Sequence, residues 1–165
     1  MEGTGTVEAA RLTDIYFRQV DMVYRLCYAY LKNSADAEDA VQNTFIRLMQ
    51  SGKCFESTEH EKAWLIVTAG NLCRDQLRHW WRKRASLEEW DGAGEVNEPE
   101  PDETLEAVLA LPGNYRAEIY LYYYEGYTGA EIAELLKKPP STVRNDLSRA
   151  RKLLRKKLGG ELDEG

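Results

Sequence analysis

The sequence predicts an all-helical protein with two small domains. Apolar residues recur at spacings of three and four over several long segments, and helix-capping residues stand near the ends of these segments. No stretch of any length alternates in the manner of a β-strand. An acidic stretch separates two groups of helical segments. We therefore expect an N-terminal domain at 11–85, an acidic flexible linker at 86–103 and a C-terminal domain at 104–160.

The first helix is predicted from one apolar stripe. Its members follow each other at spacings of four, three, four and four, which keeps them on one face of a helix. They are Tyr16, Val20, Val23, Cys27 and Leu31. Asn33 and Ser34 then end the segment. We expect the stripe to face the core.

A second helix is expected to begin at Ser34, which can act as its N-cap. Asp36 and Glu38 lie in the first turn, where the helix dipole favours acidic residues. Gly52 is suited to the C-terminal end. The residues predicted for the inner face are Val41, Phe45, Leu48 and Met49.

The third helix is predicted to open with a capping box formed by Thr58 and Glu61. Its apolar stripe consists of Leu65, Ile66, Ala69, Leu72, Cys73, Leu77 and Trp80. The opposite face carries one amide and three guanidinium groups, from Asn71, Arg74, Arg78 and Arg82. One side of this helix is therefore expected to pack while the other faces solvent or a polyanion.

The segment between the domains is strongly acidic. Residues 85–106 contain nine carboxylates and no lysine or arginine, together with two glycines and two prolines at 92–101. This composition favours an extended linker over a packed element. Because the helical faces on either side are basic, we also expect the linker to fold back on them in the free chain.

The C-terminal domain is predicted to contain a helix-turn-helix. Helices are expected near 105–111 and from Tyr115 to about Tyr124, the second ending at Gly126. Thr128 and Glu131 form a capping box for a short helix through Leu136, and Pro140 suits the first position of a long basic helix. The predicted inner face of the long helix is Val143, Leu147, Ala150, Leu154 and Leu158. The tyrosines at 120, 122, 123, 124 and 127 are expected to serve as core and scaffold.

The formal net charge of −6 hides two basic clusters, at 74–84 and 137–157. Phosphate binding depends on charge within about 8 to 10 Å, so these clusters favour binding to nucleic acid despite the acidic total.

The three cysteines form no CxxC pair and are expected to be buried thiols, and no metal or cofactor is expected. Nothing resembles a nucleophile with its base or a phosphate-binding glycine loop, so we do not expect an enzyme. Without a signal or an 18-residue apolar run, the protein is expected in the cytoplasm.

Three groups of motifs follow one another along the chain. They are DAEDAVQNTFIRL at 36–48, AWL followed by Asn71 and DQLR, and LPGNYR followed by EGYTGAEIAELL and STVRNDLSRARKLL. In this order and spacing they resemble the extracytoplasmic-function (ECF) group of the sigma-70 family of RNA polymerase sigma factors. The resemblance covers nearly the whole chain apart from the linker and the ends. It implies a region 2 helical bundle, a region 4 helix-turn-helix, and promoter-specific initiation of transcription.

The resemblance implies that the second helix docks on the clamp coiled coil of the largest subunit of core RNA polymerase, with a further contact at the flap. The residues implied are Asp39, Gln42 and Asn43. Taken without the motif, these residues are more typical of a solvated helix face than of a docking site. An anti-sigma factor, often at the membrane, is a further partner that the resemblance implies.

For promoter DNA, the resemblance implies two contact regions. The minus-10 element would meet Asn71, Arg74, Arg78, Trp81 and Arg82, and Asn71 with the loop at 51–61 would hold a flipped base. The minus-35 element would meet Ser141, Thr142, Arg144, Asn145, Ser148, Arg149 and Lys152. Arginine pairs with guanine and asparagine with adenine in the major groove.

The residues leave two other classes of protein open. One is a helix-turn-helix regulator that acts without polymerase, and the other is a sigma-like protein that only binds other proteins. Packing and base stacking are equally open for Trp81, whereas Trp64 and Trp80 are expected to be structural.

Overall fold

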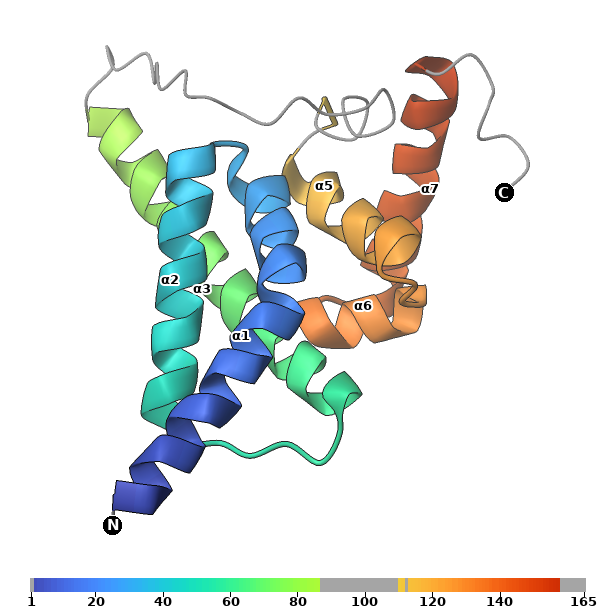
Figure 1. Cartoon of the computed structure of the whole chain (residues 1–165). Helices are drawn as coiled ribbons and strands as arrows, with labels where there is room; N and C mark the ends of the chain where they lie inside the picture. Colours follow the sequence, from blue (N-terminus) through green and yellow to red (C-terminus); the bar gives the residue numbers. More distant parts are fainter. Residues whose placement is uncertain (1, 87–109, 112, 158–165) are drawn as a thin grey trace.

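The computed structural model describes residues 2–86, 110–111 and 113–157, and every regular element in these ranges is a helix. An N-terminal bundle contains α1 (Glu2–Leu31), α2 (Ser34–Ser51) and α3 (Thr58–Ser86), which pack on one another (Figure 1). A C-terminal bundle contains α5 (Gly113–Ile119), the π-helix η1 (Tyr120–Tyr124), α6 (Gly129–Leu136) and α7 (Pro140–Lys157). The all-helical prediction is confirmed. Among the described helices, none is both long and apolar enough to cross a membrane.

Most of the predicted linker lies outside the described residues, and so does most of the helix predicted at 105–111. Ala110 and Leu111 are described, and they form a turn and a bend in place of a helix. Leu111 is buried in the core. The expected folding back of the linker therefore concerns residues that the structure does not describe.

α1 buries the face that its apolar stripe predicts, with one exception. Val23, Leu26 and Cys27 are fully buried, but Tyr16 is 41% exposed, so the prediction that Tyr16 faces the core is wrong. Tyr16 lies at the rim of the α1–α2 contact, where its ring meets the ring of Phe45 edge-on with centroids 5.0 Å apart. Its outer side consequently faces solvent.

α2 begins one residue earlier than the capping pattern suggested. The N-cap is Asn33, whose side-chain oxygen accepts a hydrogen bond from Asp36 N at 2.9 Å, and Ser34 is the first helical residue. Gly52 ends the helix with a left-handed φ of 62°, as predicted. Met49 was expected on the inner face but is 55% exposed. One residue turns a helix by about 100°, so the step from buried Leu48 carries Met49 outward.

α3 is capped by Ser57, whose hydroxyl accepts from His60 N at 3.1 Å. The capping box predicted for Thr58 and Glu61 is therefore wrong. Glu61 is drawn away from the helix end because it binds two residues of α1, as described below. The apolar stripe is confirmed at its centre, where Leu65, Ile66, Ala69 and Cys73 are fully buried.

The C-terminal bundle has the predicted helix-turn-helix. Thr128 and Glu131 form the expected capping box, with Glu131 N donating to Thr128 Oγ1 at 3.1 Å and Thr128 N donating to Glu131 Oε1 at 2.9 Å. Pro140 is the first residue of α7, as predicted. The buried residues of α7 include Val143, Leu147, Ala150 and Leu154, whereas Leu158 lies outside the described residues.

Two groups of residues are more exposed than the sequence suggested. Tyr120 is buried, but Tyr123 and Tyr124 are 41% and 44% exposed, so the expectation of a wholly packed tyrosine cluster is wrong for these two. Cys27 and Cys73 are buried, as expected, whereas Cys54 is exposed. Cys54 lies in the loop between α2 and α3, where no helix covers it.

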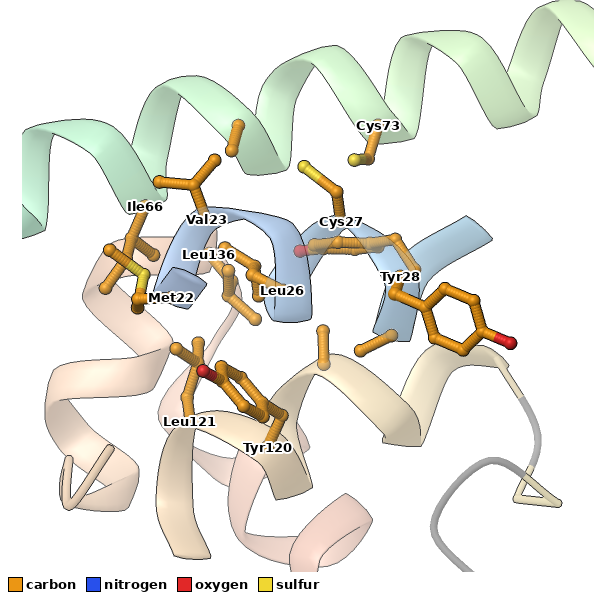
Figure 2. Packing of buried hydrophobic residues seen from close by; sticks show 14 of the residues in the cluster. Met22, Val23, Leu26, Cys27, Tyr28, Ile66, Cys73, Tyr120, Leu121 and Leu136 are labelled. Atoms are coloured by element: carbon orange, nitrogen blue, oxygen red, sulfur yellow. The ribbon is translucent and has the colours of Figure 1, made fainter. Parts of the chain in front are cut away.

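The two bundles share one hydrophobic core, which the sequence did not predict. α1 contacts α5 and η1, and α3 contacts α6. Figure 2 shows Tyr120, Leu121 and Leu136 of the C-terminal bundle beside Met22 and Leu26 of α1. The bundles therefore form one packed body in this structure.

Candidate polymerase and promoter interfaces

The residues predicted to bind polymerase lie on one exposed face of α2. Asp39, Gln42 and Asn43 are all exposed, and Asn43 Nδ2 donates to Asp39 Oδ2 at 3.4 Å. Ile46 and Met49, both exposed, continue this face by further helical turns. The polar end of the face thus adjoins an apolar end. Exposed apolar side chains beside polar ones are more typical of a protein-binding surface than of a solvated helix.

Asn71 and Arg74, predicted to meet the minus-10 element, are both half-buried in this structure. Arg74 Nη2 donates to Asn71 Oδ1 at 2.7 Å, and Arg74 Nη1 donates to the hydroxyl of Tyr30 at 2.9 Å. Burial raises the pKa of Tyr30, so its hydroxyl stays protonated. Both predicted DNA-contacting side chains therefore have partners within the N-terminal bundle.

The remaining residues predicted for the minus-10 element lie further along α3 and are exposed. Trp81 is 59% exposed, and Arg78 pairs with Asp75 on the helix surface. Arg82 is exposed as well. Exposure of Trp81 leaves its indole accessible to a nucleic acid base, as required for stacking.

The loop between α2 and α3 was expected to act with Asn71 on a single flipped base. Phe55 of this loop lies against Trp64 of α3, with ring centroids 5.9 Å apart. Asn71 lies 13 residues beyond the start of α3 at Thr58, which is about 20 Å along a helix axis. Phe55 nevertheless reaches Trp64, seven residues before Asn71, which is about 10 Å along a helix axis. A joint hold of the loop and Asn71 on one base stays a prediction.

All seven residues predicted for the minus-35 element are exposed on α7. They are Ser141, Thr142, Arg144, Asn145, Ser148, Arg149 and Lys152. They occupy the side of α7 opposite its buried face, and the first four lie in its first two turns. This is the placement by which a recognition helix presents its N-terminal residues to base edges.

A groove of about 380 Å³ runs beside this surface, lined by residues of η1, α6 and α7. Arg144, Ser148 and Arg151 line it at helical spacing, and Tyr122 of η1 also lines it. Arg151 Nη2 donates to the hydroxyl of Tyr122 at 3.0 Å, and Arg151 Nε donates to that of Tyr123 at 3.1 Å. These hydrogen bonds raise the pKa of Arg151.

Sequence reasoning missed the two tyrosines and Arg151 as parts of this surface. The run of tyrosines and the RAR sequence at 149–151 were visible, but nothing in the spacing showed that η1 turns toward α7. In η1, hydrogen bonds reach from residue i to i+5, which changes the direction of side chains relative to an α-helix.

A buried charged cluster supports the helix-turn-helix from inside. Glu118 of α5 is fully buried and pairs with Lys138 of the turn, whose Nζ lies 3.9 Å from Oδ2 of Asp146. Burial raises the pKa of Glu118 to about 7, and although Lys138 opposes this shift, hydrogen bonding with Asp146 adds to it. Asp146, although on the recognition helix, therefore faces the interior and not the predicted DNA surface.

A second buried carboxylate joins α3 to α1. Glu61 is 4% exposed and accepts from Arg18 Nε and Nη2 at 3.0 and 2.8 Å and from Gln19 Nε2 at 2.7 Å. Burial acts to raise the pKa of Glu61, but the hydrogen bonds from Arg18 and Gln19 outweigh it and hold the pKa below its usual value. Glu61 is therefore a structural anchor of the N-terminal bundle.

No group of three or more histidine, cysteine or acidic side chains in the described ranges is arranged to hold a metal ion. His60 lies against the ring of Phe55, with centroids 5.5 Å apart.

Comparison with protein families places both bundles. Sigma-70 region 2 matches residues 16–83, and Sigma-70 region 4 matches residues 102–154. Together these matches span most of the chain. The chain belongs to the sigma-70 family. From here on, region 2 denotes the N-terminal bundle and region 4 the C-terminal bundle.

Individual relatives agree with this assignment. The chain is 31% identical to the ECF RNA polymerase sigma factor SigW of Bacillus subtilis, with 90% of this chain and 88% of the relative covered. It is 34% identical to the ECF RNA polymerase sigma factor SigE of Mycolicibacterium smegmatis, with 99% and 68% covered. Both relatives are ECF sigma factors, so the chain belongs to the ECF group of the family. The match of region 2 as well as region 4 favours a sigma factor over a regulator that uses a helix-turn-helix alone.

A solved structure has the same fold. The sigma factor RpoE from Bartonella quintana, in a co-crystal with the anti-sigma factor NepR, matches with a TM-score of 0.74. The identity is 20%, and 90% of this chain and 97% of that chain are covered. At this identity the likeness concerns the fold.

Proposed function

We propose that the chain binds core RNA polymerase through α2 and directs it to promoters by reading the minus-10 element with α3 and the minus-35 element with α7. The observation that carries this proposal is the presence of three separate surfaces on the helices of regions 2 and 4. Each surface exposes residues of the expected chemistry, apart from Asn71 and Arg74, which are half-buried. Such a factor needs no catalytic group of its own.

The α2 surface is proposed to dock on the clamp coiled coil of the largest polymerase subunit, with Asp39, Gln42 and Asn43 at its polar end. Carboxylate and amide groups at helical spacing suit charge-assisted hydrogen bonds to a partner helix. The exposed Ile46 and Met49 extend the contact with apolar area. Region 4 is proposed to bind the flap.

The α3 surface is proposed to bind the non-template strand of the opened minus-10 element. Trp81 can stack on a base, and Arg78 and Arg82 can neutralise phosphates. Asn71 and the loop at 51–61 are proposed to hold one flipped base, and the contact of Phe55 with Trp64 brings the loop along α3 toward Asn71. Flipping a base costs a few kcal/mol, which stacking and hydrogen bonds offset.

The α7 surface is proposed to enter the major groove of the minus-35 element. Arg144 and Asn145 are placed for base edges, each worth about 1 to 3 kcal/mol of discrimination. The later basic residues, Lys152 among them, follow the DNA backbone.

An anti-sigma factor is a further proposed partner, by analogy with the complex of RpoE and NepR. Such a partner would act in the cytoplasm or at the membrane.

The experiment is run-off transcription from a genomic library with core polymerase and the purified chain. We expect initiation at discrete sites that share two upstream motifs. Arg144→Ala should change which sites are used, whereas Lys156→Ala, further along α7, should weaken all sites about equally. Failure to bind core polymerase, or initiation at no discrete site, would refute the proposal.

A further inference from the structure

Three charged side chains inside region 4 join the turn of the helix-turn-helix to the helices α5 and α7. Glu118 of α5 is fully buried, and Asp146 of α7 is 7% exposed. Lys138 lies in the turn before α7, pairs with Glu118, and places its Nζ 3.9 Å from Asp146 Oδ2. These three side chains form an internal triad, in which one cation lies between two buried carboxylates. The triad therefore ties α7 to α5 through the turn.

The backbone of the turn fixes the position from which the Lys138 side chain starts. Lys137 has a left-handed φ of 57°, and Lys138 N donates to Ala133 O at 2.9 Å. Pro139 follows directly, and its ring restricts both its own backbone and that of Lys138. A change in the attraction within the triad consequently acts on the two helices more than on the turn.

The triad lacks one hydrogen bond that a proton would supply. Oε1 of Glu118 is buried and accepts no hydrogen bond from any described residue, because the lysine binds Oε2. Asp146 is close enough to the Glu118 carboxyl for a hydrogen bond, but two ionised carboxylates have no donor between them. A proton on Glu118 would provide this donor and would leave the triad without net charge. Burial raises the pKa of Glu118 to about 7, so this proton is exchanged near neutral pH.

The other groups that face Glu118 keep their charge in this pH range. From α1, the hydroxyl of Tyr30 lies near Glu118, but burial raises the pKa of Tyr30 far above neutrality. That hydroxyl accepts a hydrogen bond from Arg74 of α3 at 2.9 Å. On α5 itself, Arg116 binds backbone carbonyls at the end of α1, and arginine stays charged in proteins. η1 consists of tyrosines and one leucine, and therefore adds no carboxylate, ammonium or imidazole.

No histidine or cysteine follows Cys73 and His79 in the sequence. Region 4 therefore lacks the two side chains that ordinarily titrate nearest to pH 7. A titration of region 4 near neutral pH would thus point to the internal triad.

Asp146 belongs to the same helix as the side chains proposed to read the minus-35 element. Arg144 and Asn145 point to the exposed side of α7, whereas Val143 and Leu147 are buried on the same side as Asp146. Because these residues share less than two turns of one helix, a shift at Asp146 carries Arg144 and Asn145 with it. Hydrogen bonds weaken steeply with distance and angle, so a small shift of α7 changes how well base edges are read.

We propose that Glu118, Lys138 and Asp146 are positioning residues for the minus-35 element, and that a proton shared by the two carboxylates holds α7 in its reading position. With the proton in place, the triad is neutral and draws α7 against α5. When the proton leaves to water, two like charges share one cation, and α7 moves away from α5 at Asp146. Recognition of the minus-35 element then weakens as pH rises through neutrality. The proposal rests on the proposed function for the role of α7 as the reader of DNA.

The first test measures how much the minus-35 element contributes to promoter binding at each pH. Core polymerase carrying the full chain is titrated onto two labelled promoter fragments, one with its minus-35 element intact and one with that element replaced. The ratio of the two affinities isolates minus-35 recognition, because pH effects on polymerase and on the minus-10 contacts enter both affinities alike. The measurement runs from about pH 5.5 to about pH 8.5 at constant ionic strength.

For the wild-type chain, we expect this ratio to fall about threefold to tenfold across neutral pH, as for a difference of half to one pKa unit between free and DNA-bound states. Glu118→Gln keeps an oxygen for Lys138 and gains an amide N–H for Asp146, so it imitates the protonated form. Its ratio should stay at the low-pH value throughout. Glu134→Gln, the same substitution at an exposed position of α6, is the matched control and should follow the wild type.

Asp146→Asn is a second variant that is useful if Glu118→Gln folds poorly. Its amide can donate to Glu118, and one carboxylate then faces one ammonium, so the triad is neutral without an added proton. The pH dependence should again disappear. A purely structural role of the triad would instead lower the ratio of both variants at every pH and leave the shape of the pH profile unchanged.

The amide NMR spectrum of the free full-length chain tests the movement of α7 without polymerase or DNA. In the wild type, the amides of Arg144 and Asn145 should shift along one common titration curve near neutral pH. In Glu118→Gln they should not shift in this range, whereas Glu134→Gln should behave as the wild type.

Two results would overturn the positioning role. One is a minus-35 preference that is present but independent of pH in the wild type, or that has the same pH profile in Glu118→Gln. The other is the absence of a titration at Arg144 and Asn145 in the free chain. If the affinity ratio is one at every pH, α7 reads no minus-35 element and that part of the proposed function fails, while the amides of α7 still decide whether the triad positions the helix.

Discussion

Lys138 and Asp146 face each other inside the helix-turn-helix, with Lys138 Nζ 3.9 Å from Asp146 Oδ2. The same ammonium pairs with the fully buried Glu118, whose Oε1 has no hydrogen-bond partner within the described residues. One lysine therefore serves two carboxylates. A buried pair of carboxylates with a single cation favours retention of a proton.

The first prediction concerns the pH dependence of stability. The pKa of Glu118 is raised from an ordinary value of 4.5 to about 7, so the folded state binds more protons than the unfolded state between these pH values. This contribution to stability is fully present below pH 4.5 and is lost as pH rises through 7, by roughly 3 kcal/mol. Glu118→Gln, which cannot ionise, should therefore gain stability relative to wild type between pH 5 and pH 7.5.

Thermal unfolding at several pH values checks this prediction. The useful quantity is the difference in Tm between Glu118→Gln and wild type, because other carboxylates titrate equally in both. A difference that stays constant from pH 5 to pH 7.5 would show that Glu118 does not titrate in this window.

The second prediction concerns the anchor between α1 and α3. Glu61→Ala should lower the free energy of unfolding by about 2 kcal/mol, because it leaves the buried amide of Gln19 without its partner. Arg18→Ala should cost less than about 1 kcal/mol, since the Arg18 side chain is 45% exposed and its ion pair is screened by water. Urea unfolding measures both values. Equal losses would contradict the assignment of Glu61 as the anchor.

The third prediction concerns Arg151, which η1 holds by two phenol hydroxyls. Tyr122→Phe combined with Tyr123→Phe removes both acceptors while retaining the rings. If Arg151 meets a DNA phosphate, the slope of log affinity against log salt should fall by about one, with promoter preference unchanged. Tyr124→Phe, which keeps the stacking of residue 124 on Tyr120, is the control. An altered promoter preference in the double variant would instead assign these tyrosines to base reading.

The fourth prediction concerns the capping box of α6. Thr128→Ala removes the acceptor for Glu131 N and should destabilise region 4 by about 1 kcal/mol. Glu134→Ala, at an exposed position of the same helix, should change stability by much less. Hydrogen exchange of the amides of α6 and α7 measures the local effect. Unchanged protection in Thr128→Ala would indicate that the cap does not stabilise the helix-turn-helix.

Local features were predictable where a short pattern sufficed. Neighbouring residues predict three features that the structure has: the capping box at Thr128, the left-handed conformation of Gly52, and Pro140 at the start of α7. The cap of α3 was not predictable in the same way. Thr58 and Glu61 have the right spacing, but Glu61 bonds to Arg18 and Gln19, more than 40 residues away.

The candidate sites were predictable to different degrees. On α7, helical spacing separates exposed from buried residues, and all seven predicted residues are exposed. On α3, Asn71 and Arg74 share the predicted face but are half-buried, because Tyr30 and region 4 lie against this part of the helix. Asp146 could be assigned to the interior only once Lys138 and Glu118 were placed around it.

By itself the sequence determined that the chain is helical, that its helices form two groups, and which face of α7 is exposed. These properties depend on the period of the helix and on contacts within a few residues. The tertiary structure decided three other properties. These are the packing of region 4 on region 2, the inward position of Asp146, and the hydrogen bonds from Arg151 to Tyr122 and Tyr123 of η1. They depend on side chains that are distant in the chain and that only become neighbours when apolar surfaces leave water together.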